Sequence, residues 1–397
     1  MESPPTMMRP CHGAKNVMRD SHTEGKACGS YSSSPFLTLD TLRGNLSVRR
    51  IALAYSANPT RPIQGMDMIR WVAMGHRFRW LDYKVRLVTD RRRGIDRLDR
   101  IHLTSADRMD WNECDAVKVC YQASIDLIPQ GHPHLIARMC RVVDEEYPKR
   151  DDHRRDEMLR QQEKIRDLAA IVAFNDEVNA QRWRDRYGDK QQVLIVPTGC
   201  PETLPEEGSN PFPQDKRIVL FMGSLTAHRF PGALNGLARR LRAASPDIEV
   251  HFLGKNSLQH YAGESEPLDP SLLTIHEPVD EEKTWDYVRN AHVGIGLAPS
   301  EHSFESELSK IYYYLRGGLP VVTESSVPNT SVIRETGHGG VATYGDLDDL
   351  AHTTIAAMKR APRDEAVMQH MIDKHSWRAR AEVYDAALKA RWACSAK

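Results

Sequence analysis

Residues 306–322 concentrate side chains whose types and spacing could hold an anion. The polar residues at the amino end of this segment are Ser306, Glu307, Ser309 and Lys310. The helical pattern that follows ends at Gly317 and Gly318, which predicts a helix over 307–316, and Pro320 begins a predicted strand over 320–323. The free N–H groups and the positive dipole end of such a helix favour an anion, and Lys310 adds a charged donor. The segment therefore predicts a binding site for a diphosphate.

A second group of candidates follows the apolar run Met139–Val143, which predicts a strand. Asp144 comes directly after this run, and Glu145 and Glu146 come next. A carboxylate at the carboxyl end of a strand can take the proton of a substrate hydroxyl that lies within hydrogen-bonding distance. Asp144 is therefore our candidate general base, with Arg141 as a charge partner and as a further candidate contact for the acceptor. Three adjacent acids are also typical of a solvated surface, and that alternative stays open.

The elements that position these residues alternate between strands and helices on both sides of a proline-rich segment, residues 201–216. This pattern predicts an α/β fold with two Rossmann-like domains, each a parallel sheet covered on both faces. Ligands of such sheets bind at the carboxyl ends of the strands. The loop after the first predicted strand holds Asn58 and Arg61, which we take as candidate contacts for a second substrate, with ordinary turn chemistry as the alternative.

Composition excludes several classes of protein. The number of Lys and Arg residues, 54, equals the number of Asp and Glu residues, 54, so the protein has no net charge. This argues against binding to DNA or RNA through the overall charge of the protein. No apolar run approaches the roughly 20 residues of a membrane-spanning helix, and a signal-peptide pattern is lacking, so we expect a soluble, cytoplasmic protein. The seven cysteines include no CxxC pair, so we expect neither a structural zinc site nor a disulfide framework.

The segment Lys310–Val322 resembles the donor-site helix and strand of the GT-B glycosyltransferases, which often read Lys-Leu-x-Glu-Tyr-Leu-Ala-x-Gly-x-Pro-Val-Val. The matching positions are Lys310, Tyr314, Leu315, Gly318, Pro320, Val321 and Val322. The segments 220–229, 251–254 and 290–300 resemble further strands of that family's second domain, and 196–199 resembles the segment that closes its first domain. The resemblance covers roughly residues 50–395 and is specific in the second half of the chain.

This resemblance implies two Rossmann-like domains that face each other across a cleft. We expect a disordered leader over 1–45, an acceptor-binding domain over 46–200, a linker over 201–216 and a nucleotide-sugar-binding domain over 217–374. The resembled fold also implies a C-terminal helix, 375–395, that returns to the first domain. The implied donor-binding residues are Gly223, Ser224, Arg229, Glu305, Ser306, Glu307, Ser309, Lys310 and Tyr313.

One position departs from the family pattern. Many members place a Glu that binds the donor ribose where this chain has Tyr313, although the earlier Glu of the pair is present as Glu305. A tyrosine hydroxyl cannot accept from two ribose hydroxyls as a carboxylate can. A subset resembling the bacterial xanthan glucuronosyltransferase has a Gln there. The spacing Arg141-x-x-Asp144 also resembles that subset, in which the Asp serves as base.

The expected activity is transfer of a glycosyl group from a UDP- or GDP-linked sugar to a hydroxyl of a saccharide, a lipid-linked molecule or another acceptor, in polysaccharide or glycoconjugate synthesis. Neither a metal nor a resident cofactor is expected, because fixed donors and Lys310 can neutralise the leaving diphosphate. Three alternatives stay open: a viral-type transferase acting on DNA bases, favoured by the basic tract 86–100; a non-catalytic nucleotide-sugar-binding module; and a nucleotide-sugar epimerase. Peripheral contact with a membrane is compatible with a lipid-linked acceptor.

Overall fold

The computed structural model describes residues 48–59, 65–90, 94–144, 152–258, 265–301 and 307–395, and every structural statement below concerns these residues. They form two separate sheets, one of eight strands and one of six. All strand pairs are parallel except the β3–β4 hairpin at the edge of the first sheet. The expected leader, 1–45, lies outside the described residues.

The first sheet has the strand order β3-β4-β2-β1-β5-β6-β7-β8. Its strands are β1 (Arg50–Ala54), β2 (Lys84–Thr89), β3 (Arg97–Leu98), β4 (Ile101–Ser105), β5 (Ala116–Val119), β6 (Leu135–Arg138), β7 (Ile171–Phe174) and β8 (Gln192–Ile195). The helices that pack on it are α2 (Met66–Trp80), α3 (Asp152–Leu168), α4 (Glu177–Tyr187) and α11 (Trp377–Ser395). The β3–β4 hairpin was not predicted, because charged and polar residues interrupt its short apolar pattern.

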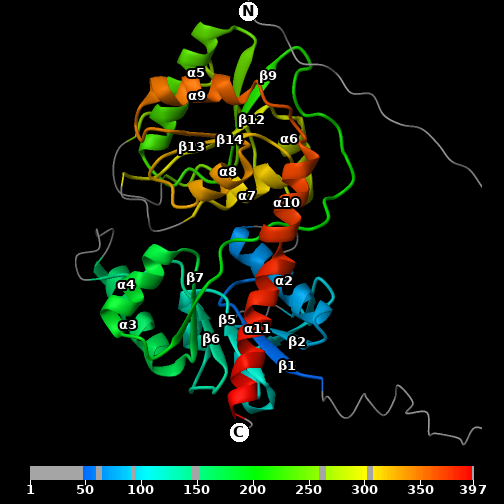
Figure 1. The fold of residues 1–397 in the computed structure, drawn as a ribbon, viewed down its shortest axis with the longest axis vertical. Coiled ribbons are helices and arrows are strands. Elements are labelled where there is room, and N and C mark those ends of the chain that lie inside the picture. The colour runs from blue at the N-terminus through cyan, green and yellow to red at the C-terminus, as the bar shows by residue number, and fades with distance from the viewer. Residues whose placement is uncertain are drawn as a thin grey trace, which may run out of the picture. The chain divides into compact units, whose positions relative to one another are not determined.

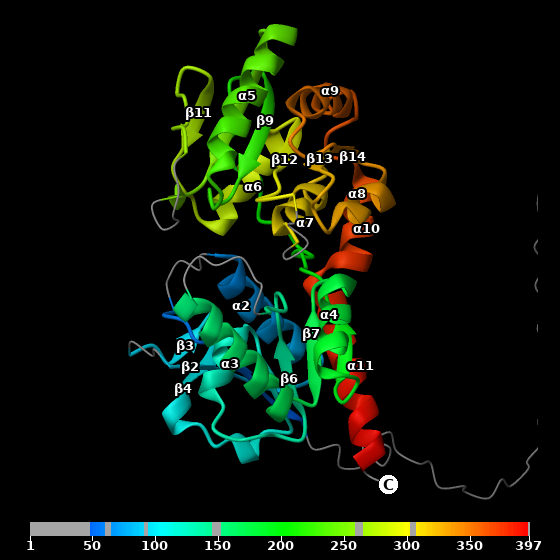
Figure 2. The same ribbon diagram turned by 90° about the vertical axis from the view of Figure 1, so that its left-hand side faces the viewer.

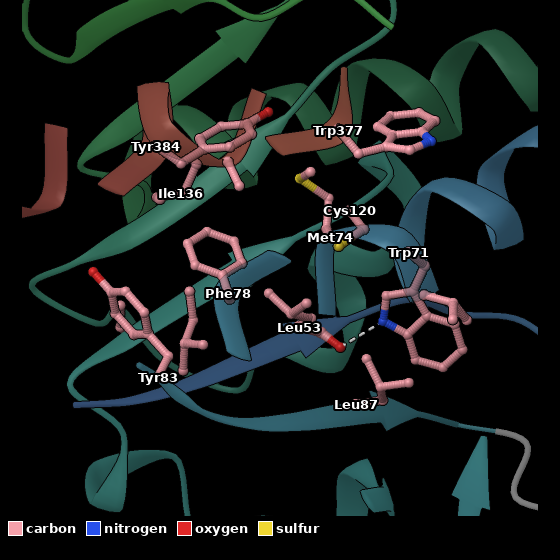
Figure 3. Packing of buried hydrophobic residues seen from close by; sticks show 14 of the residues in the cluster. Leu53, Trp71, Met74, Phe78, Tyr83, Leu87, Cys120, Ile136, Trp377 and Tyr384 are labelled. Carbon is pink, nitrogen blue, oxygen red and sulfur yellow. Dashed lines mark hydrogen bonds between the residues drawn. The ribbon is translucent and has the colours of Figure 1, made fainter. Parts of the chain in front are cut away.

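Helices α2 and α11 cover one face of this sheet and run side by side (Figure 1). Their shared core holds large side chains such as Trp71, Phe78 and Tyr384, all at most 2% exposed (Figure 3). The Trp71 indole donates to the Leu53 carbonyl at 2.8 Å, so the polar atom of this buried ring is satisfied. Helices α3 and α4 contribute to the core on the opposite face. The sheet is therefore buried on both sides, as the near-continuous apolar strands require.

The second sheet has the strand order β11-β10-β9-β12-β13-β14. Its strands are β9 (Arg217–Met222), β10 (Ile248–Leu253), β11 (Leu273–His276), β12 (Val293–Gly296), β13 (Val321–Glu324) and β14 (Gly339–Ala342). One face packs against α5 (Arg229–Ala244) and α9 (Leu347–Ala357) (Figure 2). The other face packs against α6 (Glu281–Asn290), α7 (Ser309–Arg316), α8 (Thr330–Thr336) and α10 (Glu365–His375).

The two segments of chain that connect the sheets are bonded to each other. Cys200, which follows β8, donates its N–H to the His375 carbonyl at 2.9 Å, and the Trp377 N–H returns to the Cys200 carbonyl at 2.9 Å. The joint between α10 and α11 is therefore fixed to the segment that leads into residues 201–216. In the described part of the chain, none of the helices combines the length and apolar character needed to span a membrane.

Candidate functional site

The carboxyl edge of the second sheet opens around two glycines. Gly223 follows β9 with φ of 107°, and Gly254 follows β10 with φ of 152°. A Cβ atom on Gly254 would overlap the carbonyl of Gly223, so the two backbones can approach only because no side chain intervenes. Gly223 and the next residue, Ser224, are both exposed. This edge therefore offers backbone groups to a ligand at close range.

Helix α7 begins at the same edge without a capping side chain. Its N-cap residue, Leu308, makes no side-chain cap, and Ser309 is the first helical residue. The Asn329 amide accepts from the Leu308 N–H at 2.9 Å and donates to the Leu308 carbonyl at 3.1 Å, which fixes where the helix starts. The uncapped N–H groups of the first turn and the helix dipole together favour an anion.

Lys310 supplies positive charge to this helix start. Its ammonium lies 3.7 Å from the centre of the Phe221 ring and about as close to Gly223, where an added Cβ would be 3.6 Å away. Burial lowers the pKa of Lys310 to about 7. Among the residues that the structure describes, no carboxylate lies within ion-pair distance of it. An ammonium that is desolvated without a counter-ion is the group that a bound diphosphate would compensate.

Arg229 was expected to contact the same diphosphate, and its guanidinium has another partner. Arg229, the first residue of α5, donates to both carboxylate oxygens of Glu324 at 2.6 and 2.7 Å and to the Ala298 carbonyl at 2.5 Å. Glu324 is 1% exposed and also accepts from the N–H groups of Ala298 and Gly345. The ion pair ties α5 to β13 and to the end of β12. Its contact with a donor stays a prediction.

Tyr313, the residue at the expected ribose position, packs inside the second sheet's core. It is 2% exposed and its ring stacks on Trp285 with centroids 5.0 Å apart. Its hydroxyl donates to Glu281 at 2.9 Å. Because the side chain is buried, a ribose contact by this hydroxyl would require the surrounding side chains to move.

Glu307, also expected to bind the donor, is bonded to the segment after β8. Its carboxylate accepts from the Thr198 N–H and from the Tyr312 hydroxyl, the latter at 3.0 Å, and burial raises its pKa. Arg70 of α2 donates to the Thr198 hydroxyl at 2.9 Å, and Arg380 of α11 donates to the Thr198 carbonyl at 3.2 Å. Thr198 thus joins the start of α7 to both helices that cover one face of the first sheet, α2 and α11. Glu305 and Ser306 lie outside the described residues.

The candidate base, Asp144, is exposed and follows an irregular stretch. The predicted strand over Met139–Val143 was wrong, because β6 comprises Leu135–Arg138 and only the Met139 N–H still bonds to β7, at Ala173. Beyond that point side-chain amides replace the neighbouring strand as hydrogen-bond partners of the backbone.

Two buried amides hold the backbone just before Asp144. Gln162 accepts from the Val143 N–H at 2.6 Å and donates to its carbonyl at 2.8 Å, while Asn179 accepts from the Val142 N–H at 2.9 Å. Gln162 and Asn179 are fully buried. Sequence reasoning missed both of them, because each lies in a helix rich in charged residues, where an amide reads as a surface residue.

The expected acceptor contacts are only partly placed. The Asn58 side-chain oxygen is shielded from solvent and finds no hydrogen-bond donor among the described residues. Arg141 is half-buried and already has interactions within the protein. Arg61, Glu145 and Glu146 lie outside the described residues.

A hollow of about 610 Å³ lies at the carboxyl ends of β2 and β4, where an acceptor is expected. Asp90 directly follows β2 and accepts from the Ser56 hydroxyl at 2.8 Å. The hollow is also lined by Ser105, the last residue of β4, by Asp107 and Asp126, and by the aromatic ring of Trp111. Carboxylates, a hydroxyl and an aromatic ring are suited to a hydroxyl-rich molecule. Sequence reasoning missed this group, because its members come from separate loops.

A possible metal-binding group lies on α8 and α10. Glu335, His370 and His375 have ligand atoms within 4.8 Å of one another. Arg380, which can only donate, bonds to His375 Nδ1 at 2.8 Å, so the neutral ring carries its proton on the Nε2 that faces Glu335 at 3.4 Å. Burial, with the Arg380 charge, lowers the pKa of His375 to about 4. A protonated Nε2 has no lone pair for a metal, so this group fits a hydrogen-bond chain better than a metal site.

Comparison with solved structures identifies the fold. Sucrose-phosphate synthase from Thermosynechococcus elongatus matches with a TM-score of 0.64 at 14% identity, over 87% of this chain and 100% of that one. HepE from Anabaena, in complex with UDP and glucose, matches with a TM-score of 0.65 at 11% identity, over 86% and 100%. The E. coli trehalose-6-phosphate protein bound with UDP-2-fluoro glucose matches with a TM-score of 0.61 at 11% identity, over 86% and 99%.

No family model and no curated protein matches the sequence. The solved neighbours are glycosyltransferases of the GT-B type, and the chain shares their fold over most of its length. The predicted fold, two parallel-sheet domains of the GT-B class, is confirmed.

Proposed function

We propose that this protein transfers a sugar from a nucleoside diphosphate sugar to a hydroxyl acceptor. The observation that carries the proposal is the Lys310 ammonium, which is desolvated, has no counter-ion among the described residues and lies at the uncapped start of α7. A diphosphate would supply that counter-ion and would accept from the helix N–H groups at the same time. Two solved neighbours are described with UDP or a UDP-sugar, which favours UDP over GDP as the nucleotide.

The chemistry proposed for the donor side needs no metal. As the bond between sugar and diphosphate breaks, negative charge grows on the leaving diphosphate. Lys310 and the N–H groups of α7 are already aimed at that position, so they stabilise the charge without rearranging. Gly223 lies beside Lys310, Ser309 is the first residue of α7, and with Ser224, which follows Gly223, they are the further donors of this proposal.

On the acceptor side, Asp144 is the proposed base. An exposed carboxylate on a backbone held by Gln162 and Asn179 combines a fixed position with access to a substrate hydroxyl. In a direct displacement, the acceptor hydroxyl attacks the sugar carbon from the side opposite the leaving diphosphate, and a base must remove the hydroxyl proton there. A base role for Asp144 therefore favours inversion at the sugar carbon. The hollow beside Asp90 and Trp111 is the proposed acceptor site, for a soluble or lipid-linked saccharide, and we expect the reaction to take place in the cytoplasm.

The test is to measure thermal shifts with a panel of UDP- and GDP-linked sugars, using the wild type and Lys310→Met. A ligand at 100 times its Kd stabilises by about 2.7 kcal/mol, which is readily detected. A shift with one nucleotide sugar that is strongly reduced in Lys310→Met supports the proposed donor site. Equal shifts in both proteins would contradict it.

A second candidate function is a non-catalytic nucleotide-sugar-binding module. The observation in its favour is the Tyr313 hydroxyl, which bonds to Glu281 and leaves the expected ribose position without a carboxylate. Incubation of the bound nucleotide sugar with and without a panel of saccharide acceptors separates the two functions. Release of UDP that depends on an acceptor identifies a transferase, tight binding without turnover identifies the module, and an altered sugar on the recovered nucleotide identifies an epimerase.

A further inference from the structure

Basic residues lie side by side near the amino ends of β1, β2 and β4. Arg50 of β1 is in register with Lys84 of β2, and Arg86 of β2 is in register with His102 of β4. His102 is in turn opposite Arg97 of β3. All five side chains are exposed. Arg97 Nη2 lies 3.4 Å from His102 Nε2, so these two side chains are partners. Arg50 and Lys84 are directly opposed like charges, which destabilise a sheet, and an anion bound beside them would relieve that repulsion.

The same side chains line a hollow of about 730 Å³. Its six arginine and lysine residues are Arg50, Arg79, Lys84, Arg86, Arg97 and Arg100. Glu113 is the only carboxylate in the described lining, and it lies 3.5 Å from Arg50. Apolar residues, among them Ile51 and Ile101, complete the wall. The hollow therefore combines a large excess of positive charge with a concave shape.

Arg50 is paired with Glu113, but several of the other cations have no ion pair within the described residues. In the described part of the chain, neither Lys84 nor Arg100 has a carboxylate within ion-pair distance. Arg86 reaches only the Met109 sulfur, at 4.0 Å, and Arg79 donates to the Arg100 carbonyl at 3.4 Å. Asp99 and Arg100 form the two-residue turn between β3 and β4, and both have the positive φ that such hairpin turns require. This turn sets Arg100 beside the hollow.

We propose that this hollow binds a compact ligand that carries several phosphate groups. Guanidinium and ammonium groups converging on one space match multiple phosphate oxygens, and guanidinium groups bind them in pairs of parallel hydrogen bonds. A bilayer or a DNA duplex presents its phosphates on a broad surface and cannot fill a hollow of this volume. The hollow lies at the amino ends of the strands, whereas the proposed transferase chemistry uses the carboxyl ends, so this inference is independent of the proposed function.

The experiment measures the binding of inorganic tripolyphosphate to the full chain by isothermal titration calorimetry at two salt concentrations. Every protein carries Lys310→Met, so that the proposed donor site does not contribute its lysine. The pocket variant is Lys84→Gln, Arg86→Gln and Arg100→Gln. The matched control is Lys190→Gln, Lys359→Gln and Arg360→Gln. It makes the same change of net charge on exposed residues elsewhere in the protein.

We expect saturable binding that weakens with salt, an affinity loss of at least about 10-fold in the pocket variant and less than about 2-fold in the control. Thermal unfolding without ligand checks the fold: the pocket variant loses cross-strand repulsion and is expected to unfold at the same or a higher temperature at low salt. Absence of saturable binding, or equal losses in both variants, would overturn the proposal. The proposal would also be overturned if phosphatidylserine vesicles or duplex DNA bound through these three residues and tripolyphosphate did not displace them.

Discussion

Nucleotide-sugar binding is expected to take up a proton, because of Lys310. Burial lowers the pKa of this ammonium to about 7 in the free protein. A bound diphosphate stabilises the charged form and should return the pKa toward the ordinary lysine value of about 10.4. Well below pH 7 the lysine is charged in both states and contributes no pH dependence. Above pH 7 the free lysine is neutral, so binding must bring a proton and the affinity falls as the pH rises.

The size of the effect follows from the two pKa values. For a free value near 7 and a bound value above 10, Kd rises about 15-fold between pH 7 and pH 8.5, and the uptake at pH 8.5 is close to one proton. Calorimetry at each pH, in two buffers of different ionisation enthalpy, measures the affinity and the proton count together. A UDP-sugar is the suitable ligand, because its esterified diphosphate has no proton to lose in this range.

Two substitutions assign the effect to Lys310. Lys310→Arg keeps a permanent charge, so its affinity should be flat between pH 7 and pH 8.5. Lys310→Met removes the charge and should bind weakly at every pH, with a loss of roughly 1.5–3 kcal/mol at pH 7. A flat wild-type profile would refute the reasoning about the free ammonium. A slope that persists in Lys310→Met would show that another group takes up the proton.

The remaining predictions concern catalysis, stability and metal. Asp144→Asn should lower turnover by about 10²–10⁴ with donor affinity retained, whereas Glu145→Gln should have little effect; equal, mild losses would leave Asp144 an ordinary surface acid. Arg229→Met leaves the buried Glu324 carboxylate unpaired and should lower the free energy of unfolding, measured in urea, by about 3–5 kcal/mol. Adding Glu324→Gln to the same protein removes the unpaired charge and should restore much of this loss. Gly254→Ala forces a side chain against Gly223 and should cost more than about 2 kcal/mol in the same assay. A chelator should leave transferase turnover unchanged, and complete loss of activity would contradict a metal-independent reaction.

Local pattern in the sequence was enough for the fold class. Strands such as β9 and β10 are mostly apolar and are followed by glycine, which is typical of parallel strands ending at a ligand edge. The glycines and proline that bound the α7 segment marked its helix and the next strand correctly within two residues. The place of Lys310 at a helix start was predicted in the same way, because it depends only on neighbours in the chain, whereas its contact with a donor stays a prediction.

Tertiary structure decided what each candidate contacts. Arg229 and Glu324 are 95 residues apart, and no periodicity relates them, so the sequence could not show that they neutralise each other. The direction of the Tyr313 hydroxyl depends on Glu281 and Trp285 of another helix. The backbone before Asp144 is held by amides from two helices, which is why an apolar run there is not a strand.

The row of basic residues shows the same division between sequence and structure. The sequence shows a basic tract over 86–100, but only the register of β1, β2, β3 and β4 brings Arg50 and Lys84 together and sets Arg86 beside His102. Periodicity within one segment specifies which face of an element is buried, because that depends on local backbone geometry. Which charges meet depends on how distant segments pair, and that is determined only when the chain has folded.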